Sequence, residues 1–450
     1  MAEAKDIDDS LEFLRSFEKY TESQDLITTV QNKLEKNKGR LELCLESLTE
    51  DDFKALADLE PLSRVTHLDL RETGLTTAGL VHLSGSKYLS GLKHLKLDNN
   101  NIDDDGCFYL SKVSTFSNLI ELNLSANEIG PLGIKLLSGS KTLTCLQTLD
   151  ISYNRIQSQG IQALAESELG NRLTRLVLSD TGMGDTGLDQ FGRKASMQEL
   201  ATLELSDNHL TDKSIGTLAR SSGFPNLKNL IFDNNHLGDD GVYELADGVL
   251  CENLEELRLK CNELTTDSAI SISKSCTLTN LKKLDLNNND IRAEGTEALS
   301  QSKNCQQLEA LDLGENQLNA DGAKALANSP FLKNMKELRL NDNNIGDVGI
   351  TALASSSNLP KLEALYLEQG NWIKPAGAKA IADSDHFSNL KTLVLGLNAI
   401  GDEGARYLAE SEKLGNLVFL NVIGNKLTPS GEDALRFSTQ LTNLKTLELV

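Results

Sequence analysis

The sequence has few aromatic residues and no long apolar run. Phe, Trp and Tyr make up 4% of its 450 residues, and there is one Trp. No stretch of about 18 apolar residues occurs, so we expect no membrane span. The first ten residues, MAEAKDIDDS, are acidic and lack an apolar segment, so we expect no signal peptide. With 39% hydrophobic residues, this composition predicts a soluble protein whose core is filled by Leu, Ile and Ala.

Motifs of common catalytic sites are also missing. The sequence contains no P-loop, no H-E-x-x-H and no G-x-S-x-G. The formal net charge is -22, whereas nucleic acids and anionic membranes are bound by clustered Lys and Arg. We therefore expect no enzymatic activity, no cofactor, and no nucleic acid or membrane as the main ligand.

The cysteines do not form a disulfide or metal pattern. There are seven, an odd number, their spacing is irregular and no C-x-x-C occurs; they are Cys44, Cys107, Cys145, Cys251, Cys261, Cys276 and Cys305. Disulfide frameworks use even sets, and structural zinc sites use closely spaced pairs. We predict free thiols, no bound metal, and a reducing, cytoplasmic location.

A repeat dominates what is present. The stretch from Leu92 to Leu110, LKHLKLDNNNIDDDGCFYL, returns after 27 residues from Leu119 and again from Leu146. The pattern L-x-x-L-x-L-x-x-N-x-L at a fixed period is the signature of leucine-rich repeats. The sequence therefore predicts stacked coils rather than several globular domains.

Elementary rules assign a role to each position of one coil. Leu95 and Leu97 are two residues apart, so they share the inner face of a strand. Asn100 ends the strand, and its amide can bond backbone groups of the next coil. The run from Asp103 to Asp105 supplies oxygens and negative charge at a helix N-terminus. The helix then carries Leu110 inward, and neighbouring coils bury what one coil cannot.

The repeat extends over most of the chain. We assign residues 1–37 to a helical N-terminal cap of two short helices and residues 38–450 to the repeat domain. That domain comprises a degenerate first coil, 14 regular repeats and a final strand. Every step is 27 residues except the 28 between Leu362 and Leu390. The N-terminal helices could cover the apolar edge of the first coil or bind a partner, and we favour the cover.

These units resemble the ribonuclease-inhibitor-like class of leucine-rich repeats. The resemblance implies an α/β solenoid of horseshoe shape, with a parallel sheet on the concave face and helices on the convex face, and it implies protein binding. The uniform period and the free cysteines are most similar to bacterial and bacterial-effector members. One difference is that ribonuclease inhibitors alternate two repeat lengths.

Outward strand positions make the concave face acidic. Over the 14 repeats they carry 16 acids and 7 bases, which would attract a basic partner. One group is mixed in charge, and we expect it to be satisfied by cross-strand pairs. Its members are Arg258, Lys260, Lys283, Asp285, Asp312 and Arg339.

Two histidines occupy equivalent strand positions. His67 and His94 lie on adjacent coils, with Asp69 and Asp98 nearby, so their side chains should be about 4.8 Å apart. The spacing fits either a metal pair or two solvated side chains. We favour the solvated pair and predict no metal site.

The outward positions become apolar near the end of the chain. We predict that this group is a protein-binding site, because exposed apolar patches and aromatic anchors are typical of interfaces. Its members are Tyr366, Trp372, Val394, Leu397, Phe419 and Ile423. Self-association is the alternative, since the final strand from Leu444 presents an unpaired edge.

These observations favour a non-enzymatic scaffold that binds another, unidentified protein. The narrower hypothesis is a secreted bacterial effector acting in the host cytosol. Two alternatives stay open. One is a module that regulates an enzyme, such as a small-GTPase-activating protein, and the other is a homo-oligomer formed through the C-terminal end.

Overall fold

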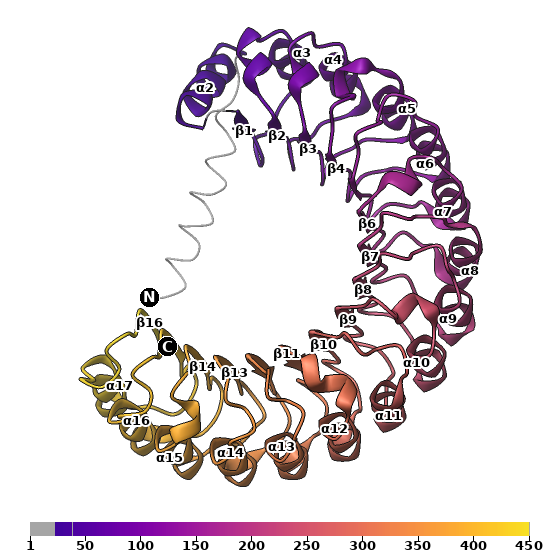
Figure 1. Ribbon diagram of the computed structural model, residues 1–450. Coiled ribbons are helices and arrows are strands. Elements are labelled where there is room, and N and C mark those ends of the chain that lie inside the picture. The colour runs from indigo at the N-terminus through magenta and orange to yellow at the C-terminus, as the bar shows by residue number, and fades with distance from the viewer. Residues whose placement is uncertain (1–22, 38, 450) are drawn as a thin grey trace. The chain divides into compact units, whose positions relative to one another are not determined.

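The computed structural model describes residues 23–37 and 39–449. By its contacts the chain divides into two compact units, Met1–Asn208 with Ser222–Asn226, and His209–Ser221 with Leu227–Val450. Within each unit the strands lie on the inner side of a curved stack and the helices on its outer side (Figure 1). No helix of the described residues is long and apolar enough to cross a bilayer.

The described residues of the first unit contain seven strands, which pair in chain order and in parallel. They are β1 (Arg40–Glu42), β2 (His67–Asp69), β3 (His94–Lys96), β4 (Glu121–Asn123), β5 (Thr148–Asp150), β6 (Arg175–Val177) and β7 (Thr202–Glu204). The helices are α2 (Ser23–Lys36), α3 (Glu50–Ala57), α4 (Thr77–Ser84), α5 (Asp104–Lys112), α6 (Pro131–Ser138), α7 (Gln157–Ala165) and α8 (Gly184–Lys194).

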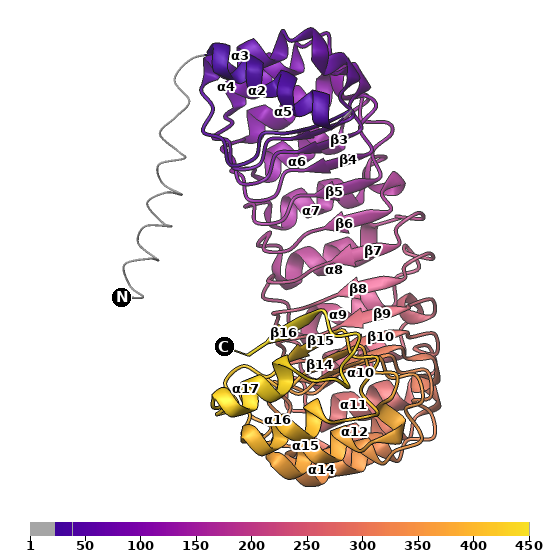
Figure 2. The same ribbon diagram turned by 90° about the vertical axis from the view of Figure 1, so that its left-hand side faces the viewer.

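The second unit repeats the arrangement, and Figure 2 shows its helices α14 to α17 following one another along the stack. Its strands are β8 (Asn229–Ile231), β9 (Glu256–Arg258), β10 (Lys283–Asp285), β11 (Ala310–Asp312), β12 (Glu337–Arg339), β13 (Ala364–Tyr366), β14 (Thr392–Val394), β15 (Phe419–Asn421) and β16 (Thr446–Glu448). Its helices are α9 (Asp212–Ala219), α10 (Asp239–Ala246), α11 (Thr266–Lys274), α12 (Arg292–Ser300), α13 (Asn319–Ala327), α14 (Gly346–Ala354), α15 (Pro375–Ala382), α16 (Gly401–Ala409) and α17 (Pro429–Arg436).

The repeated leucines form the core between the two layers. Leu92, Leu95, Leu97 and Leu110 are at most 1% exposed. The strand register equals the repeat period, since Leu68 pairs with Leu95 and Leu95 with Leu122. The α/β leucine-rich-repeat fold predicted from the 27-residue period is therefore confirmed.

In most coils an asparagine after the strand links the coil to the preceding one. The Asn100 amide donates to the carbonyl oxygens of Leu70 and Leu97 at 2.9 and 3.0 Å, and its Oδ1 accepts from the N–H of Leu75 at 2.8 Å. The sequence predicted the bonding residue correctly but the direction wrongly, because the partner coil is the preceding one. Where Thr73 replaces the asparagine, its hydroxyl donates to Leu70 O at 2.8 Å.

A second link joins the helix starts of neighbouring coils. Asp103 caps its own helix, accepting from Asp105 N and Gly106 N at 3.1 Å. The next residue, Asp104, reaches the following coil and accepts from Gly130 N and Gly133 N at 2.7 and 2.8 Å. A Cβ at Gly133 would lie 2.5 Å from Asp104 Oδ1, so the glycine leaves room for this inter-coil cap.

Two local predictions meet different outcomes. The second predicted N-terminal helix is α2, which buries Leu26 and Val30 and contacts α3 and β1. The first predicted helix lies outside the described residues.

The extra residue of the 28-residue step is taken up in the turn after β13, where Gln369, Gly370 and Trp372 have positive φ.

We expect that deleting residues 281–307 leaves a folded, shorter protein. The deletion brings β9 next to β11, and both present a leucine at the same register position. Circular dichroism should show unchanged helicity per residue. The matched control deletes residues 281–294, which breaks the register and should unfold several coils. Loss of all helicity after the 27-residue deletion would contradict the assigned register.

Substituting Asn316 by Ala should destabilise its coil by about 3 kcal/mol. The change removes the donor to Leu286 O and Gly314 O, both at 2.8 Å, and the acceptor of Ile291 N. Hydrogen exchange at Ile291 N–H should accelerate, and the urea midpoint should fall. Asn328→Ala, the same change at an exposed helix end, is the control and should alter stability by less than about 0.5 kcal/mol.

Candidate functional site

The predicted apolar site lies on consecutive coils of the second unit. Trp372 and Leu397 are 65% and 52% exposed. Tyr366, Phe419 and Ile423 are half-buried. Trp372 stands in the turn after β13, Leu397 and Ile423 in the turns after β14 and β15, and Phe419 opens β15. The group thus extends across the sheet face and onto the turns that follow it.

Val394 differs from the other members of this group. It was expected to be exposed, but only 6% of it is accessible. In the sheet register Val394 lies between Tyr366 on β13 and Asn421 on β15, and side chains at such positions pack against each other. The prediction that Val394 is exposed is therefore wrong: the side chain is buried, with register neighbours on β13 and β15 on either side of it.

The structure brings part of the group together. Leu397 N donates to Ile423 O at 2.7 Å, so these two residues stand on touching turns. Phe419 has threonines as its register partners, Thr392 and Thr446. The Arg339 guanidinium lies 3.9 Å from the ring centroid of Tyr366, which joins the apolar group to the charged one.

The predicted charged group is satisfied mainly by partners that sequence reasoning did not name. Arg258 pairs with the buried Asp233, and its Nε lies 3.8 Å from Asp285 Oδ2. Arg339 pairs with Glu337 at 2.6 Å rather than with Asp312. Lys283 lies 3.6 Å from Glu256, and the Lys260 backbone N–H donates to Asp233 at 3.0 Å.

Asp312 lies among these charges, and none of the residues that the structure describes forms an ion pair with it. Its Oδ1 accepts from Gly314 N at 2.9 Å and from Asn287 Nδ2 at 3.4 Å. Burial, together with the charge of Asp285, raises the pKa of Asp312 to about 6. A carboxyl group with this pKa is partly protonated near neutral pH.

The first unit carries a tyrosine among acids, which sequence reasoning missed. Tyr153 is 54% exposed and follows β5 with φ of 53°. Burial, followed by the charges of Asp207, Asp180, Glu204 and Asp150, raises the pKa of its phenol. The signal was that Tyr153 is the one aromatic residue at this turn position in the 14 repeats.

The two histidines of the first unit stack on each other. The rings of His67 and His94 are 4.0 Å apart with an angle of 9° between planes, and His94 Nδ1 lies 2.9 Å from Glu121. Burial and the neighbouring His94 lower the pKa of His67. Nitrogen lone pairs lie in the ring planes, so stacked rings do not aim them at one ion. Among the described residues, no group of three or more His, Cys, Asp or Glu could hold a metal.

A column of alternating charge, also missed, runs along the edge where the strands of the second unit begin. Its members directly precede successive strands and are Lys228, Glu255, Lys282, Glu309, Lys336, Glu363 and Lys391. Glu255 lies 2.9 Å from Lys228 and 2.7 Å from Lys282. The hydrogen bond from Lys282, followed by that from Lys228, lowers the pKa of Glu255 to about 2.

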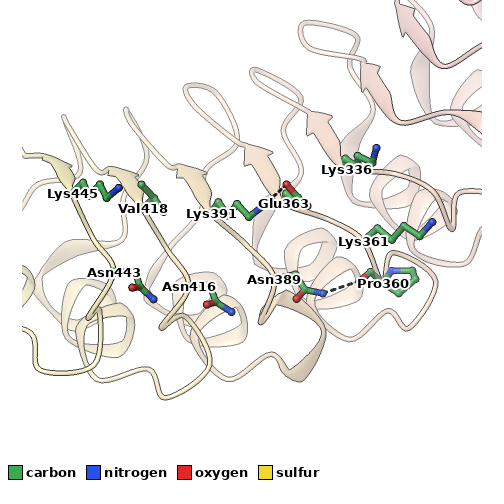
Figure 3. A pocket seen from close by; sticks show the side chains of 10 residues that line it. All are labelled: Lys336, Pro360, Lys361, Glu363, Asn389, Lys391, Asn416, Val418, Asn443 and Lys445. Atoms are coloured by element: carbon green, nitrogen blue, oxygen red, sulfur yellow. Dashed lines mark hydrogen bonds and ion pairs between the residues drawn. The ribbon is translucent and has the colours of Figure 1, made fainter.

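A groove of about 580 Å³ lies beside the C-terminal part of this column (Figure 3). One wall continues the column with Val418 and Lys445. The opposite wall includes Asn389, Asn416 and Asn443, whose amides donate to backbone carbonyls of the preceding coil at 2.7 to 3.0 Å. The lining contains four lysines and one carboxylate, Glu363, so the groove is basic although the protein is acidic.

Comparison with known proteins supports the fold assignment. A family model described as Leucine Rich repeat matches nine segments, residues 91–111, 117–138, 142–165, 225–246, 250–273, 277–300, 304–327, 331–354 and 388–409. No curated protein matches the sequence.

Solved structures with similar folds share little sequence. TLR13 in its complex with ssRNA13 has 22% identity and a TM-score of 0.56, over 91% of this chain and 59% of that one. An internalin (inlF) of Listeria monocytogenes has 19% identity and a TM-score of 0.44, over 90% and 89% of the two chains. Rad7 in the yeast complex with Elc1 has 16% identity and a TM-score of 0.49, over 99% and 97%.

The family matches and the geometry agree. The matched segments fall on the strands and helices of both units, and the parallel register with its asparagine links recurs at the period of the sequence. The chain is a leucine-rich-repeat protein.

Proposed function

We propose that this chain is a non-enzymatic scaffold that binds another protein through its C-terminal coils. The contact surface is the sheet face and the turns that carry Tyr366, Trp372, Leu397, Phe419 and Ile423. The observation that carries the proposal is the exposure of Trp372, the one Trp of the sequence, at 65%. A large ring held in water on an ordered turn is typical of an interface anchor.

The surroundings of Trp372 support this role. Asn371 fixes the turn, since its amide donates to Leu340 O at 2.8 Å and its Oδ1 accepts from Asn343 N at 3.2 Å. A side chain on an ordered turn loses less conformational entropy on binding than one on a loose loop. Leu397 on the next coil adds a second exposed apolar side chain, as apolar interface cores require.

The acidic parts of the sheet face favour a partner that also carries basic residues. Around Tyr153 they include Asp150, Asp180, Glu204 and Asp207, whose charges reach the tyrosine. Opposite charge on a partner would accelerate association and orient it. A segment of the partner that carries Lys or Arg fits this acidic surface of the first unit.

We further propose that the protein works in a reducing, cytoplasmic compartment. All seven cysteines are free, and Cys107, Cys251 and Cys305 are buried. Burial raises the pKa of Cys251 and of Cys305 to about 12, which keeps these thiols protonated and unreactive. Such a set of thiols suits a compartment in which disulfides do not persist.

Substituting Trp372 by Ala should lower the affinity for the partner about tenfold or more. The ring is mostly in water, so thermal unfolding should hardly change. The measurement compares proteins retained from a cell extract by the intact chain and by the variant, using quantitative mass spectrometry. The control is Tyr243→Ala, which removes a 62% exposed ring from α10 on the helical face.

The outcome separates hetero-binding from self-association. A retained protein that is lost with Trp372→Ala and kept with Tyr243→Ala supports the proposal. If the protein lost is a second copy of this chain, the scaffold is a homo-oligomer. If the retained protein is lost equally with Trp372→Ala and with Tyr243→Ala, or with neither variant, the proposed binding site is wrong.

Thiol titration should find seven free thiols in denatured, unreduced protein. In the folded protein Cys145 and Cys276 should react first because they are exposed, and Cys107, Cys251 and Cys305 last because they are buried. The rates can be followed with a chromogenic disulfide reagent. Five or fewer thiols in freshly prepared protein would argue against a reducing compartment.

A further inference from the structure

The alternation of lysine and glutamate in the edge column of the second unit stops at Val418. The position after Lys391 would carry the next glutamate, but it is a half-buried valine, and Lys445 follows it. The backbone continues unchanged, since Val418 N donates to Lys391 O at 2.8 Å and Lys445 N to Val418 O at 2.9 Å. Two lysines therefore flank a place without a carboxylate.

Elsewhere in the same column, the position between two lysines is occupied by a glutamate. Lys228 and Lys282 are also two coils apart, and Glu255 stands between them. One carboxylate oxygen of Glu255 lies 2.9 Å from Lys228 Nζ and the other 2.7 Å from Lys282 Nζ. Parallel strands are about 4.8 Å apart, so the backbones of Lys391 and Lys445 have the spacing of that pair.

The cations near Val418 have fewer partners than those near Glu255. Lys391 pairs with Glu363 at 2.8 Å on one side, and Val418 offers it nothing on the other. Lys445 is exposed, and among residues 23–37 and 39–449 no carboxylate lies within ion-pair distance of its ammonium. Lys361 bonds to the neutral Asn334 Oδ1 at 2.8 Å. Positive charge is thus left uncompensated along the groove.

We propose that this groove binds an acidic segment of a partner protein. One Glu or Asp carboxylate of the segment takes the place between Lys391 and Lys445 that Glu255 takes between Lys228 and Lys282. A further carboxylate meets Lys361 along the groove (Figure 3), whereas Lys336 is already paired with Glu309 at 2.8 Å. The inference is independent of the apolar site around Trp372.

The geometry favours a polypeptide carboxylate as the ligand. Glu255 shows that two lysines at this spacing, Lys228 and Lys282, accept a carboxylate with one oxygen toward each ammonium. The groove is lined by residues of successive coils, from Lys336 to Lys445, which suits an extended segment rather than a compact ion. An exposed ion pair contributes little by itself, so several carboxylates on one segment are required.

The test uses the chain of 450 residues and a fluorescein-labelled hexaglutamate peptide. Fluorescence anisotropy should show saturable binding that weakens as the salt concentration rises. A hexaglutamine peptide should not bind. If the two peptides bind alike, the groove does not recognise carboxylates and the inference is wrong.

Two substitutions of Val418 form the sharpest comparison. Val418→Glu places a carboxylate between the two lysines, so hexaglutamate should bind about tenfold more weakly, through lost pairs and added repulsion. Val418→Gln has the same shape without charge and should bind hexaglutamate like the original protein. Unchanged binding to Val418→Glu, with its melting temperature retained, would overturn the proposal.

Lys445→Gln provides a second route if Val418→Glu does not fold. This side chain is exposed, so its removal should leave the melting temperature unchanged while hexaglutamate binding falls several-fold. Binding equal to that of the original protein would contradict the role of Lys445. A phosphoserine peptide without carboxylates that binds when hexaglutamate does not would assign the groove to phosphate instead.

Discussion

The structure depends on the fact that one coil cannot satisfy its own backbone or bury its own leucines. Each strand has three residues, and every strand hydrogen bond goes to another coil. The buried asparagine extends this dependence into the turn, because Asn100 bonds the carbonyl of Leu70 and the N–H of Leu75 in the coil before it. Stability is therefore shared between adjacent coils, as in other stacked repeats.

The same constraint arranges side chains in columns. A fixed period places equivalent positions side by side, so each outward residue meets the residues one period away in sequence. In the edge column this gives direct pairs such as Lys336 with Glu309 at 2.8 Å. In the charged group of the sheet face the chain also uses residues within a coil, such as Glu337 for Arg339. Ion pairs therefore form between register partners of neighbouring strands in the edge column, and within one strand where a long side chain can contact a nearer residue.

The sequence was sufficient for the fold because its signal is periodic. The spacing of Leu95 and Leu97, the turn at Asn100 and the cap at Asp103 each follow from local rules, and each occurs in the structure. The inter-coil cap by Asp104 was not predictable in the same way, since it depends on the distance between two helix starts. Periodicity placed Val394 on the outward face of its strand but could not show that its side chain is buried there.

The choice of partner within the charged group lies beyond sequence spacing as well. Arg339 has Asp312 as its register partner in the preceding strand and Glu337 two residues away in its own strand. Which of the two it pairs with depends on side-chain torsions, which the spacing of residues in the sequence does not determine. The structure has Arg339 on Glu337 and against the ring of Tyr366. That choice leaves Asp312 with neutral hydrogen-bond donors and a raised pKa.

A repeat protein can change its function without changing its fold where one repeat carries a different type of residue from the equivalent position of its neighbours. The leucines that form the core are buried, whereas Val418 is half-buried and its column neighbours Lys391 and Lys445 are exposed. Exposed ion pairs contribute little to stability, so a valine in place of a glutamate disturbs the stack slightly. It nevertheless removes one negative charge between two lysines. The extra residue before Trp372 acts in the same way, because Asn371 still makes the inter-coil bonds while the turn gains an exposed ring.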